Sequence, residues 1–465
     1  MKIFKILLIF FVSIGVLNAQ LPQSISDMIY KDRIEPSNLS ILITNKRDGS
    51  IVASLNPYKP MVPASVAKIA TAYAVLLEFG KNFKWPTQVY YSGKIKNGTL
   101  QGDIIVKGYG DPTLNANDLK SFAKKLRSYG IRAISGKLII DRTFFKNSPK
   151  ISSGFDKNYL SEYNAMPDAL MFNDHLNKLE IIPSQNGVVA KRFFGDKSFK
   201  VINHLKATNK ACRRPYNWPK MRFFKDGDSI GVALDGTFST KCHPIILNRV
   251  LAKTYKSFYY SFAYYLKQSG ISFSGGLRLQ KVPKSAKLLF THYSKPLIQI
   301  VSKTLKKSNN LYARHLFLIL GAKRYGYPAT IEKSQRAIRE ILGAKGVLDS
   351  DDFIYNGCGL TKKARLKATS AAKILDSAYR DFGDSWLNAL SIAGVDGTLK
   401  KRFRYTIVKN RAFMKTGTLK KAKNIAGFVK SINGNLYNCV IFYNGAKIWL
   451  GRDVQNKIIT WLVKQ

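Results

Sequence analysis

The chain has 465 residues, too many for one compact core, so about two or three domains are expected. Hydrophobic residues make up 45% and aromatic residues 12% of the chain, which excludes a disordered or low-complexity protein. Lysine and arginine total 76 against 28 aspartate and glutamate residues, and the resulting formal net charge of +48 favours a polyanionic partner, either nucleic acid or an anionic cell-surface polymer.

The N-terminus has the pattern of a secretory signal peptide. Lys2 and Lys5 precede an apolar run over residues 6–17, and Ala19 follows at a position typical of cleavage. The run is shorter than the roughly 20 residues that a membrane-spanning helix needs. We therefore expect residues 1–19 to direct secretion across the inner membrane, into the periplasm or cell envelope. No nucleic acid is expected as a partner there, because the basic residues are spread along the chain without a recognisable binding module.

The first half of the chain predicts a hairpin, a helix and a long strand-rich block. Residues 40–53 alternate as a hairpin, with Ile41, Ile43, Ile51 and Ala53 on one face. An apolar helix is predicted from about Ser65 to just before Gly80. From there to about residue 290, short strands are interrupted by glycine, asparagine and proline.

Helical patterns return over residues 296–342, and three strands and an amphipathic helix end the chain. This order predicts a discontinuous domain, in which the N-terminal hairpin joins the C-terminal strands in one antiparallel sheet flanked by helices. We place this catalytic domain at residues 20–90 and 290–465, and a strand-rich insertion of one or more domains at residues 91–289.

The four cysteines show no spacing typical of a zinc site, and neither a metal nor another cofactor is expected. In an oxidising compartment, Cys212 and Cys242 can form a disulfide across a loop-rich stretch. Free buried thiols are the alternative, because connectivity cannot be deduced from sequence.

A serine and a lysine lie one helical turn apart at Ser65 and Lys68, so their side chains share a helix face. A serine hydroxyl becomes an effective nucleophile when a nearby base takes its proton, and a buried lysine amine can be that base. The same S-x-x-K spacing occurs at residues 121–124 and 370–373, where a solvated helix face explains it. That explanation also remains open for Ser65, although its neighbours are apolar.

Two further short runs carry suitable groups. Ser308 and Asn310 begin a predicted helix, where a serine is also a common cap. In a predicted strand, a glycine admits a ligand close to the backbone, and flanking lysine and threonine side chains can bind a carboxylate. An ordinary edge strand with a bulge is the alternative. The residues of this run are Lys415, Thr416, Gly417 and Thr418.

In this order, S-x-x-K, S-x-N and K-T-G are the signature of penicillin-binding proteins and serine β-lactamases. With further runs at residues 108–114, 393–399 and 426–428, the chain resembles D-alanyl-D-alanine carboxypeptidases/endopeptidases of the low-molecular-mass class C type, which carry a large insertion. The resemblance implies a multidomain α/β (α+β) protein. Its β-lactamase/transpeptidase-like domain has an antiparallel sheet flanked by helices, and the strand-rich insertion interrupts it.

The resemblance also implies a serine peptidase that hydrolyses the D-alanyl-D-alanine terminus of peptidoglycan stem peptides, and it leaves open whether cross-links are cleaved as well. β-Lactam antibiotics are the implied covalent inhibitors. The implied catalytic residues are Ser65, Lys68 and Ser308, with the backbone N–H groups of Ser65 and Thr418 stabilising the oxyanion. The implied substrate-binding residues are Asn310, Lys415, Thr416, Gly417 and Thr418.

Three positions depart from the family pattern. Asn356 and Cys358 stand where an acid and a serine are usual, and Arg314 replaces a common acidic residue. We expect catalysis to survive, with substrate preference or local packing altered. A β-lactamase or esterase on the same scaffold is the alternative enzyme, although the insertion argues against it. A catalytically silent peptidoglycan-binding protein that acts through its charge is the alternative of another class.

Overall fold

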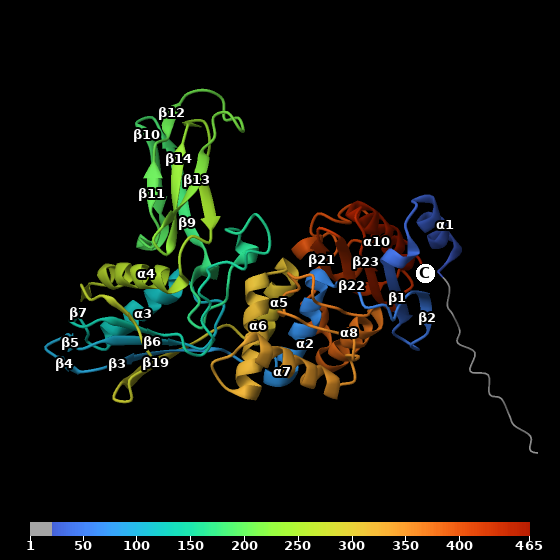
Figure 1. Cartoon of the computed structure of the whole chain (residues 1–465), viewed down its shortest axis with the longest axis horizontal. Coiled ribbons are helices and arrows are strands. Elements are labelled where there is room, and N and C mark those ends of the chain that lie inside the picture. Colours follow the sequence, from blue (N-terminus) through green and yellow to red (C-terminus); the bar gives the residue numbers. More distant parts are fainter. Residues whose placement is uncertain (1–20) are drawn as a thin grey trace, which may run out of the picture.

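A computed structural model describes residues 21–465, so the predicted signal peptide at residues 1–19 lies outside the described residues. Figure 1 shows an elongated molecule, in which α3 and α4 with their sheet lie at one end and β21–β23 with α10 at the other. A small group of strands around β13 and β14 projects beside α4. No helix within residues 21–465 combines the length and apolar character needed to cross a bilayer.

The main sheet joins both ends of the chain. Its six strands are antiparallel in the order β2-β1-β23-β22-β21-β20. β1 pairs with β23 along its whole length, which confirms that the N-terminal hairpin joins the C-terminal strands. The strands are β1 (Leu39–Asn45), β2 (Ile51–Leu55), β20 (Ser391–Ile392), β21 (Ala412–Leu419), β22 (Ala422–Lys430) and β23 (Leu436–Tyr443).

The predicted inner face of the hairpin is wrong at one residue. Ile41, Ile43 and Ala53 are fully buried, but Ile51 is 48% exposed. A register shift between Ile43 and Thr44 pairs Thr44 with Ile51. Because side chains alternate between the two faces of a strand, an irregularity of one residue moves Ile51 off the buried face.

Helices cover both faces of the main sheet because its strands alternate between two apolar cores. Ala426 and Val440 face a core with α2, whereas Ile425 and Ile441 face a core with α1 and α10. The helices of the first face are α2 (Lys68–Phe79), α5 (Leu297–Lys307), α6 (Asn310–Tyr325), α7 (Ile331–Ala344), α8 (Ala368–Phe382) and α9 (Asp384–Leu387). Those of the second are α1 (Gln23–Lys31) and α10 (Ile448–Val463).

Helix α2 lies at the centre of the first core. Every residue from Lys68 to Leu76 is buried, as expected for a helix that is apolar on all sides. The helix ends at Gly80, as predicted, whereas its predicted first turn is a separate 3-10 turn, η2 (Ala64–Ala67). Lys68 is therefore a charged side chain placed at the start of an otherwise apolar helix.

Besides the projecting strands, the insertion contains two sheets covered by two helices. β3 pairs with β19 and with β6, so β3 extends across the predicted boundary at residue 90 and β19 extends across the one at residue 290. The division into domains at those residues stays a prediction.

The larger sheet has the order β18 (Leu277–Leu279), β8 (Leu138–Asp141), β6 (Ile104–Gly108), β3 (Pro86–Tyr91) and β19 (Lys287–Tyr293). The smaller has the order β17 (Ser272–Phe273), β7 (Ala133–Ile134), β5 (Thr99–Gln101) and β4 (Lys94–Lys96). The helices are α3 (Ala116–Ser128) and α4 (Thr254–Gln268).

The projecting strands form three small sheets around a core of their own. The first contains β9 (Asn177–Ser184), β10 (Gly187–Arg192) and β16 (Ile245–Arg249). The others contain β11 (Val201–Asn203), β13 (Lys220–Asp226) and β14 (Ser229–Asp235), and β12 (Lys206–Thr208) with β15 (Thr237–Ser239). A Cys212–Cys242 disulfide, with Cα atoms 5.1 Å apart, joins the loops beside them and confirms the bridge that the sequence allows. Cys358 and Cys439 are free and buried.

Removal of this disulfide should loosen the projecting strands. The bridge closes a loop with a sequence separation of 30. By loop-closure entropy, the Cys212→Ser/Cys242→Ser variant should lose about 3 to 4 kcal/mol of local stability. Hydrogen exchange should then be faster in β13–β15 than in the oxidised protein, with β21–β23 unchanged. Equal exchange rates in the two proteins would contradict a stabilising role of the bridge.

Candidate active site

Ser65 lies on the 3-10 turn that precedes α2, next to strand β21. Ala64 has a φ of 49°, a left-handed conformation that costs a non-glycine residue on the order of 1 kcal/mol. The apolar neighbours Val66 and Ala67 are buried and anchor the turn in the core, while Ser65 itself is half-buried. The sequence therefore holds the serine at the edge of the first core, with its backbone N–H facing β21.

The Lys68 amine is fully buried and makes three hydrogen bonds. Its Nζ lies 2.8 Å from Ser65 Oγ, 2.7 Å from Asn310 Oδ1 and 2.6 Å from the carbonyl oxygen of Cys358. An ammonium group has three N–H donors, and each one finds an acceptor here. The geometry therefore satisfies the charged amine, and it also brings the amine within proton-transfer distance of the serine hydroxyl.

The electrostatic surroundings favour loss of a proton from Lys68. The pKa of the Lys68 amine is lowered from its ordinary value to about 8, mainly by burial. The nearby positive charge of Arg314 contributes to this lowering, whereas Cys358 acts in the opposite direction. About a tenth of the amine is therefore neutral at pH 7.

A second buried lysine approaches the site from the sheet. Lys415 Nζ donates to Ser308 Oγ at 2.9 Å and to the carbonyl oxygen of Thr416 at 2.7 Å. Burial, and secondarily the charge of Lys68, hold the pKa of the Lys415 amine well below its ordinary value. Ser308 has a φ of 54° at the junction of α5 and α6, and Asn309 accepts the backbone N–H of Tyr312 as the cap of α6. Ser308 therefore does not serve as the N-terminal cap of α6.

Strand β21 carries the K-T-G-T run directly against the turn that holds Ser65. A Cβ atom at Gly417 would lie 2.8 Å from the carbonyl oxygen of Pro63 and 3.0 Å from the Ser65 nitrogen, so only glycine allows this approach. β21 pairs with β22 without a register shift, so the run contains no bulge. β20 pairs only with Phe413 and Met414, so the run itself lies at an open edge of the sheet.

The two threonines of the run border a small basic cavity. Thr416 Oγ1 lies 2.8 Å from Thr398 Oγ1, and Thr418 Oγ1 accepts a hydrogen bond from Lys423 Nζ at 3.1 Å. The cavity has a volume of about 320 Å³. Its cationic lining residues are Lys401, Arg402, Lys423 and Arg452. Such a lining favours an anionic group, for example the carboxylate at the end of a peptide.

The structure thus brings the three motifs together. Ser65, Lys68 and Asn310 form one hydrogen-bonded group, Lys415 and Ser308 form a second, and Gly417 lies against the Ser65 backbone. Thr416 and Thr418 border the adjacent cavity. The solvated-face explanation of Ser65 and Lys68 is therefore wrong, because Lys68 is buried.

Three groups at the site were not predicted. The carbonyl oxygen of Tyr163 accepts a hydrogen bond from Asn310 Nδ2 at 3.0 Å, and the carbonyl oxygen of Cys358 accepts one from Lys68. The third group is Thr398, which contacts Thr416. Thr398 and Cys358 lie in runs that the family resemblance singles out, so a signal for them existed. Tyr163 contributes only its backbone, which no side-chain motif can reveal.

The departures from the family pattern preserve the local geometry. Asn356 Oδ1 accepts the backbone N–H groups of Cys358 at 3.2 Å and Gly359 at 3.0 Å, the acceptor function that a carboxylate would also supply. Cys358 contacts Lys68 through its backbone, so its side chain is not part of that hydrogen bond. Arg314 is buried and donates to the carbonyl oxygen of Ala165.

Comparison with known proteins agrees with this geometry. Residues 21–465 match the model of the D-Ala-D-Ala carboxypeptidase 3 (S13) family. The D-alanyl-D-alanine carboxypeptidase DacB of Haemophilus influenzae is 28% identical over 440 residues, covering 91% of this chain and 88% of the relative. The crystal structure of penicillin binding protein 4 (dacB) from Haemophilus influenzae has a TM-score of 0.78 at 26% identity, covering 95% of this chain and 99% of that one. Its complex with a novel β-lactam has a TM-score of 0.75 at 25% identity, covering 95% and 100% of the two chains.

The fold and the site define a serine peptidase with a β-lactamase/transpeptidase-like domain, which confirms the predicted fold class and the predicted kind of enzyme. The chain belongs to the D-Ala-D-Ala carboxypeptidase 3 (S13) family.

A side chain at Gly417 should separate β21 from the turn at Ser65. The Gly417→Ala variant places its Cβ against backbone atoms that cannot rotate away, so we expect at least a tenfold loss of D-alanine release from a short D-alanyl-D-alanine peptide. The matched control is Gly343→Ala on α7, where no atom lies within 4 Å of the added Cβ. Full activity of the Gly417→Ala variant would show that the close approach of β21 is not required.

Proposed function

We propose that the enzyme removes the terminal D-alanine from peptidoglycan stem peptides through an acyl-enzyme on Ser65, and that β-lactams acylate the same serine. The observation that carries this proposal is the 2.8 Å contact between Ser65 Oγ and the buried amine of Lys68. Membership of a D-Ala-D-Ala carboxypeptidase family, and a β-lactam complex of a similar protein, support it.

In the first step Ser65 Oγ attacks the carbonyl carbon of the penultimate D-alanine. The neutral form of Lys68 accepts the hydroxyl proton over the existing contact. Asn310 holds Lys68 through its Oδ1 atom, and it is itself held by the carbonyl oxygen of Tyr163. The lysine thus acts as the general base, and Asn310 fixes its position.

The negative charge that develops on the attacked carbonyl oxygen needs hydrogen-bond donors. The backbone N–H groups of Ser65 and Thr418 are the proposed donors, since Gly417 allows β21 to lie against the turn of Ser65. The terminal carboxylate of the substrate binds beside Thr416 and Thr418, where the basic cavity opens. Lys415 of the same strand lies beside Ser308 and is a further N–H donor for the carboxylate.

Collapse of the tetrahedral intermediate breaks the amide C–N bond. The leaving D-alanine takes a proton through Ser308, which accepts a hydrogen bond from Lys415. Water then attacks the Ser65 ester, which releases the shortened peptide and restores the serine. A cross-link presents the same D-alanyl carbonyl with a different leaving amine, so the same steps cleave it.

The proposed location is the periplasm or cell envelope, to which the predicted signal peptide at residues 1–19 would direct the enzyme. The net charge of +48 supports retention near the anionic polymers of the envelope. Such retention would weaken as salt screens the charges.

Replacement of the nucleophile gives the direct test. The Ser65→Ala variant should lose all covalent labelling by a fluorescent penicillin, measured after denaturing gel electrophoresis, because no hydroxyl remains to be acylated. The control is Ser121→Ala, which removes the exposed serine of another S-x-x-K run. Undiminished labelling of Ser65→Ala protein with an unchanged melting temperature would refute the assignment.

The pH dependence of acylation should report the pKa of Lys68. Only the neutral amine can accept the serine proton, so the rate of penicillin acylation should rise with pH and reach half its maximum near pH 8. Stopped-flow measurement of acylation between pH 5 and pH 10 would record this profile, provided that a melting curve shows the protein folded at each pH.

Arg314 provides a second test of the same base. Its positive charge lowers the pKa of Lys68, so the Arg314→Gln variant should shift the half-maximal rate to a higher pH. Arg314→Lys retains the charge and serves as the matched control. A profile of Arg314→Gln that coincides with the wild type would exclude this electrostatic influence.

A further inference from the structure

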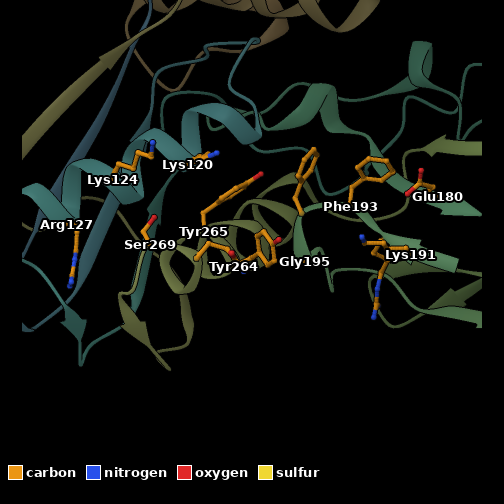
Figure 2. A pocket seen from close by; sticks show the side chains of 13 residues that line it. Lys120, Lys124, Arg127, Glu180, Lys191, Phe193, Gly195, Tyr264, Tyr265 and Ser269 are labelled. Atoms are coloured by element: carbon orange, nitrogen blue, oxygen red, sulfur yellow. The ribbon is translucent and has the colours of Figure 1, made fainter. Parts of the chain in front are cut away.

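A second, larger cavity lies in the insertion, in a part of the fold remote from the catalytic motifs. It has a volume of about 890 Å³ and opens between α3, α4 and the loop that follows β10. In Figure 1 these elements lie at the opposite end of the molecule from β21–β23 and α10. Figure 2 shows aromatic side chains between cationic side chains of α3 and Lys191. We call this cavity the insertion groove.

Four aromatic rings line the insertion groove. Phe193 and Phe194 follow β10, with ring centroids 5.5 Å apart, and Tyr264 and Tyr265 end α4 with centroids 5.2 Å apart. Phe194 and Tyr265 bridge the two pairs at 6.4 Å. Tyr264 is 40% exposed. The rings thus form a continuous wall in which Tyr264 faces solvent, while Phe194 and Tyr265 also pack against the core of the insertion.

The backbone at this wall is held in an uncommon conformation. Phe194 has a φ of 53°, which costs a non-glycine residue on the order of 1 kcal/mol. A Cβ atom at Gly195 would lie 2.8 Å from the Cβ of Tyr264, so glycine permits the loop to pack directly on α4. Strain of this kind persists where the surrounding structure imposes it, and it is concentrated at binding sites.

Cations surround the aromatic wall. Lys120, Lys124 and Arg127 recur on one side of α3 at helical spacing, and Lys191 projects from β10 on the other side. Glu180 is the acid among the lining residues. Asp118 of α3 instead faces His292. Positive charge therefore exceeds negative charge among the lining residues, beside the aromatic rings.

We propose that the insertion groove binds a glycan strand of peptidoglycan together with its acidic stem peptides. Sugar rings have apolar faces that pack on aromatic rings, and the free carboxylates of the stem peptides pair with lysine and arginine. A groove of rings and cations can also bind single-stranded nucleic acid. The glycan is favoured because the peptide that reaches Ser65 is attached to it; the inference therefore rests on the proposed function and deepens it.

Binding of the strand at a second site raises the concentration of stem peptides around Ser65. The groove should therefore matter for polymeric substrate and not for a short soluble peptide, which is too small to occupy both sites. This difference separates a polymer-binding role from a general effect on the fold or on the chemistry.

Charge reversal in the groove gives the binding test. In a Ser65→Ala background, which cannot consume the polymer, Lys124→Glu/Lys191→Glu should weaken co-sedimentation with purified sacculi about tenfold at low salt. The matched control is Lys94→Glu/Lys96→Glu on the exposed strand β4, which changes the net charge equally within the same insertion. Equal weakening by the two pairs would overturn the proposal, because net charge alone would then explain binding.

Activity of the same pairs on a wild-type Ser65 background gives the second arm. Release of D-alanine from sacculi should fall about tenfold for the groove pair, whereas kcat/KM on a short D-alanyl-D-alanine peptide and the rate of penicillin acylation stay unchanged. An equal fall on both substrates would overturn the polymer-binding role. The proposal would also be overturned if, in a competition experiment, a single-stranded RNA homopolymer occupied the groove in preference to soluble glycan fragments.

Failure of the proposed function would be recognised separately. If the wild-type enzyme released no D-alanine and formed no adduct with penicillin, the chemistry assigned to Ser65 would fail. The co-sedimentation result in the Ser65→Ala background would still decide whether the groove binds the glycan.

Discussion

The site depends on the burial of one amine beside one hydroxyl. Removing the Lys68 ammonium group from water costs roughly several kcal/mol unless its N–H donors find hydrogen-bond acceptors. Ser65, Asn310 and the Cys358 carbonyl supply those partners, so the charged form is tolerated while burial still lowers the pKa. A lysine on a solvated helix face would keep its proton at neutral pH. The apolar character of α2 is thus a requirement of the chemistry as well as of the core.

The sheet and the helices position this amine from opposite sides. β21 can lie against the turn of Ser65 only because Gly417 has no side chain, and the same strand places Lys415 where it reaches Ser308. Two buried amines near each other would repel if both were protonated, and this repulsion adds to the lowered pKa of Lys415. Packing therefore links the protonation of the two lysines, since protonation of one amine makes protonation of the other less favourable.

The sequence allowed the main architecture and the convergence of the three motifs to be predicted, because both have local patterns. Alternation predicted the hairpin, and motif order predicted that distant residues such as Ser65, Ser308 and Lys415 meet. The failures have non-local causes. A bulge moved Ile51 to the surface, and the first turn at Ser65 is a 3-10 turn that packs against β21, a strand distant in the sequence. The carbonyl of Tyr163 reaches Asn310 from the insertion, a contact that only the folded chain creates.

Helix α6 connects the insertion to the catalytic chemistry. Asn310 bonds Lys68 on one side and the Tyr163 carbonyl on the other, while Arg314 and His315 bond the carbonyls of Ala165 and Gly110. The insertion therefore does more than extend the molecule: its backbone holds the Asn310 amide that accepts a hydrogen bond from Lys68, the proposed base. An arginine at position 314 suits this arrangement, because it can donate to a buried carbonyl where an acid could not, and its charge also favours the neutral form of Lys68. The residue that departs from the family pattern thus contacts the insertion and lowers the pKa of Lys68, the proposed base.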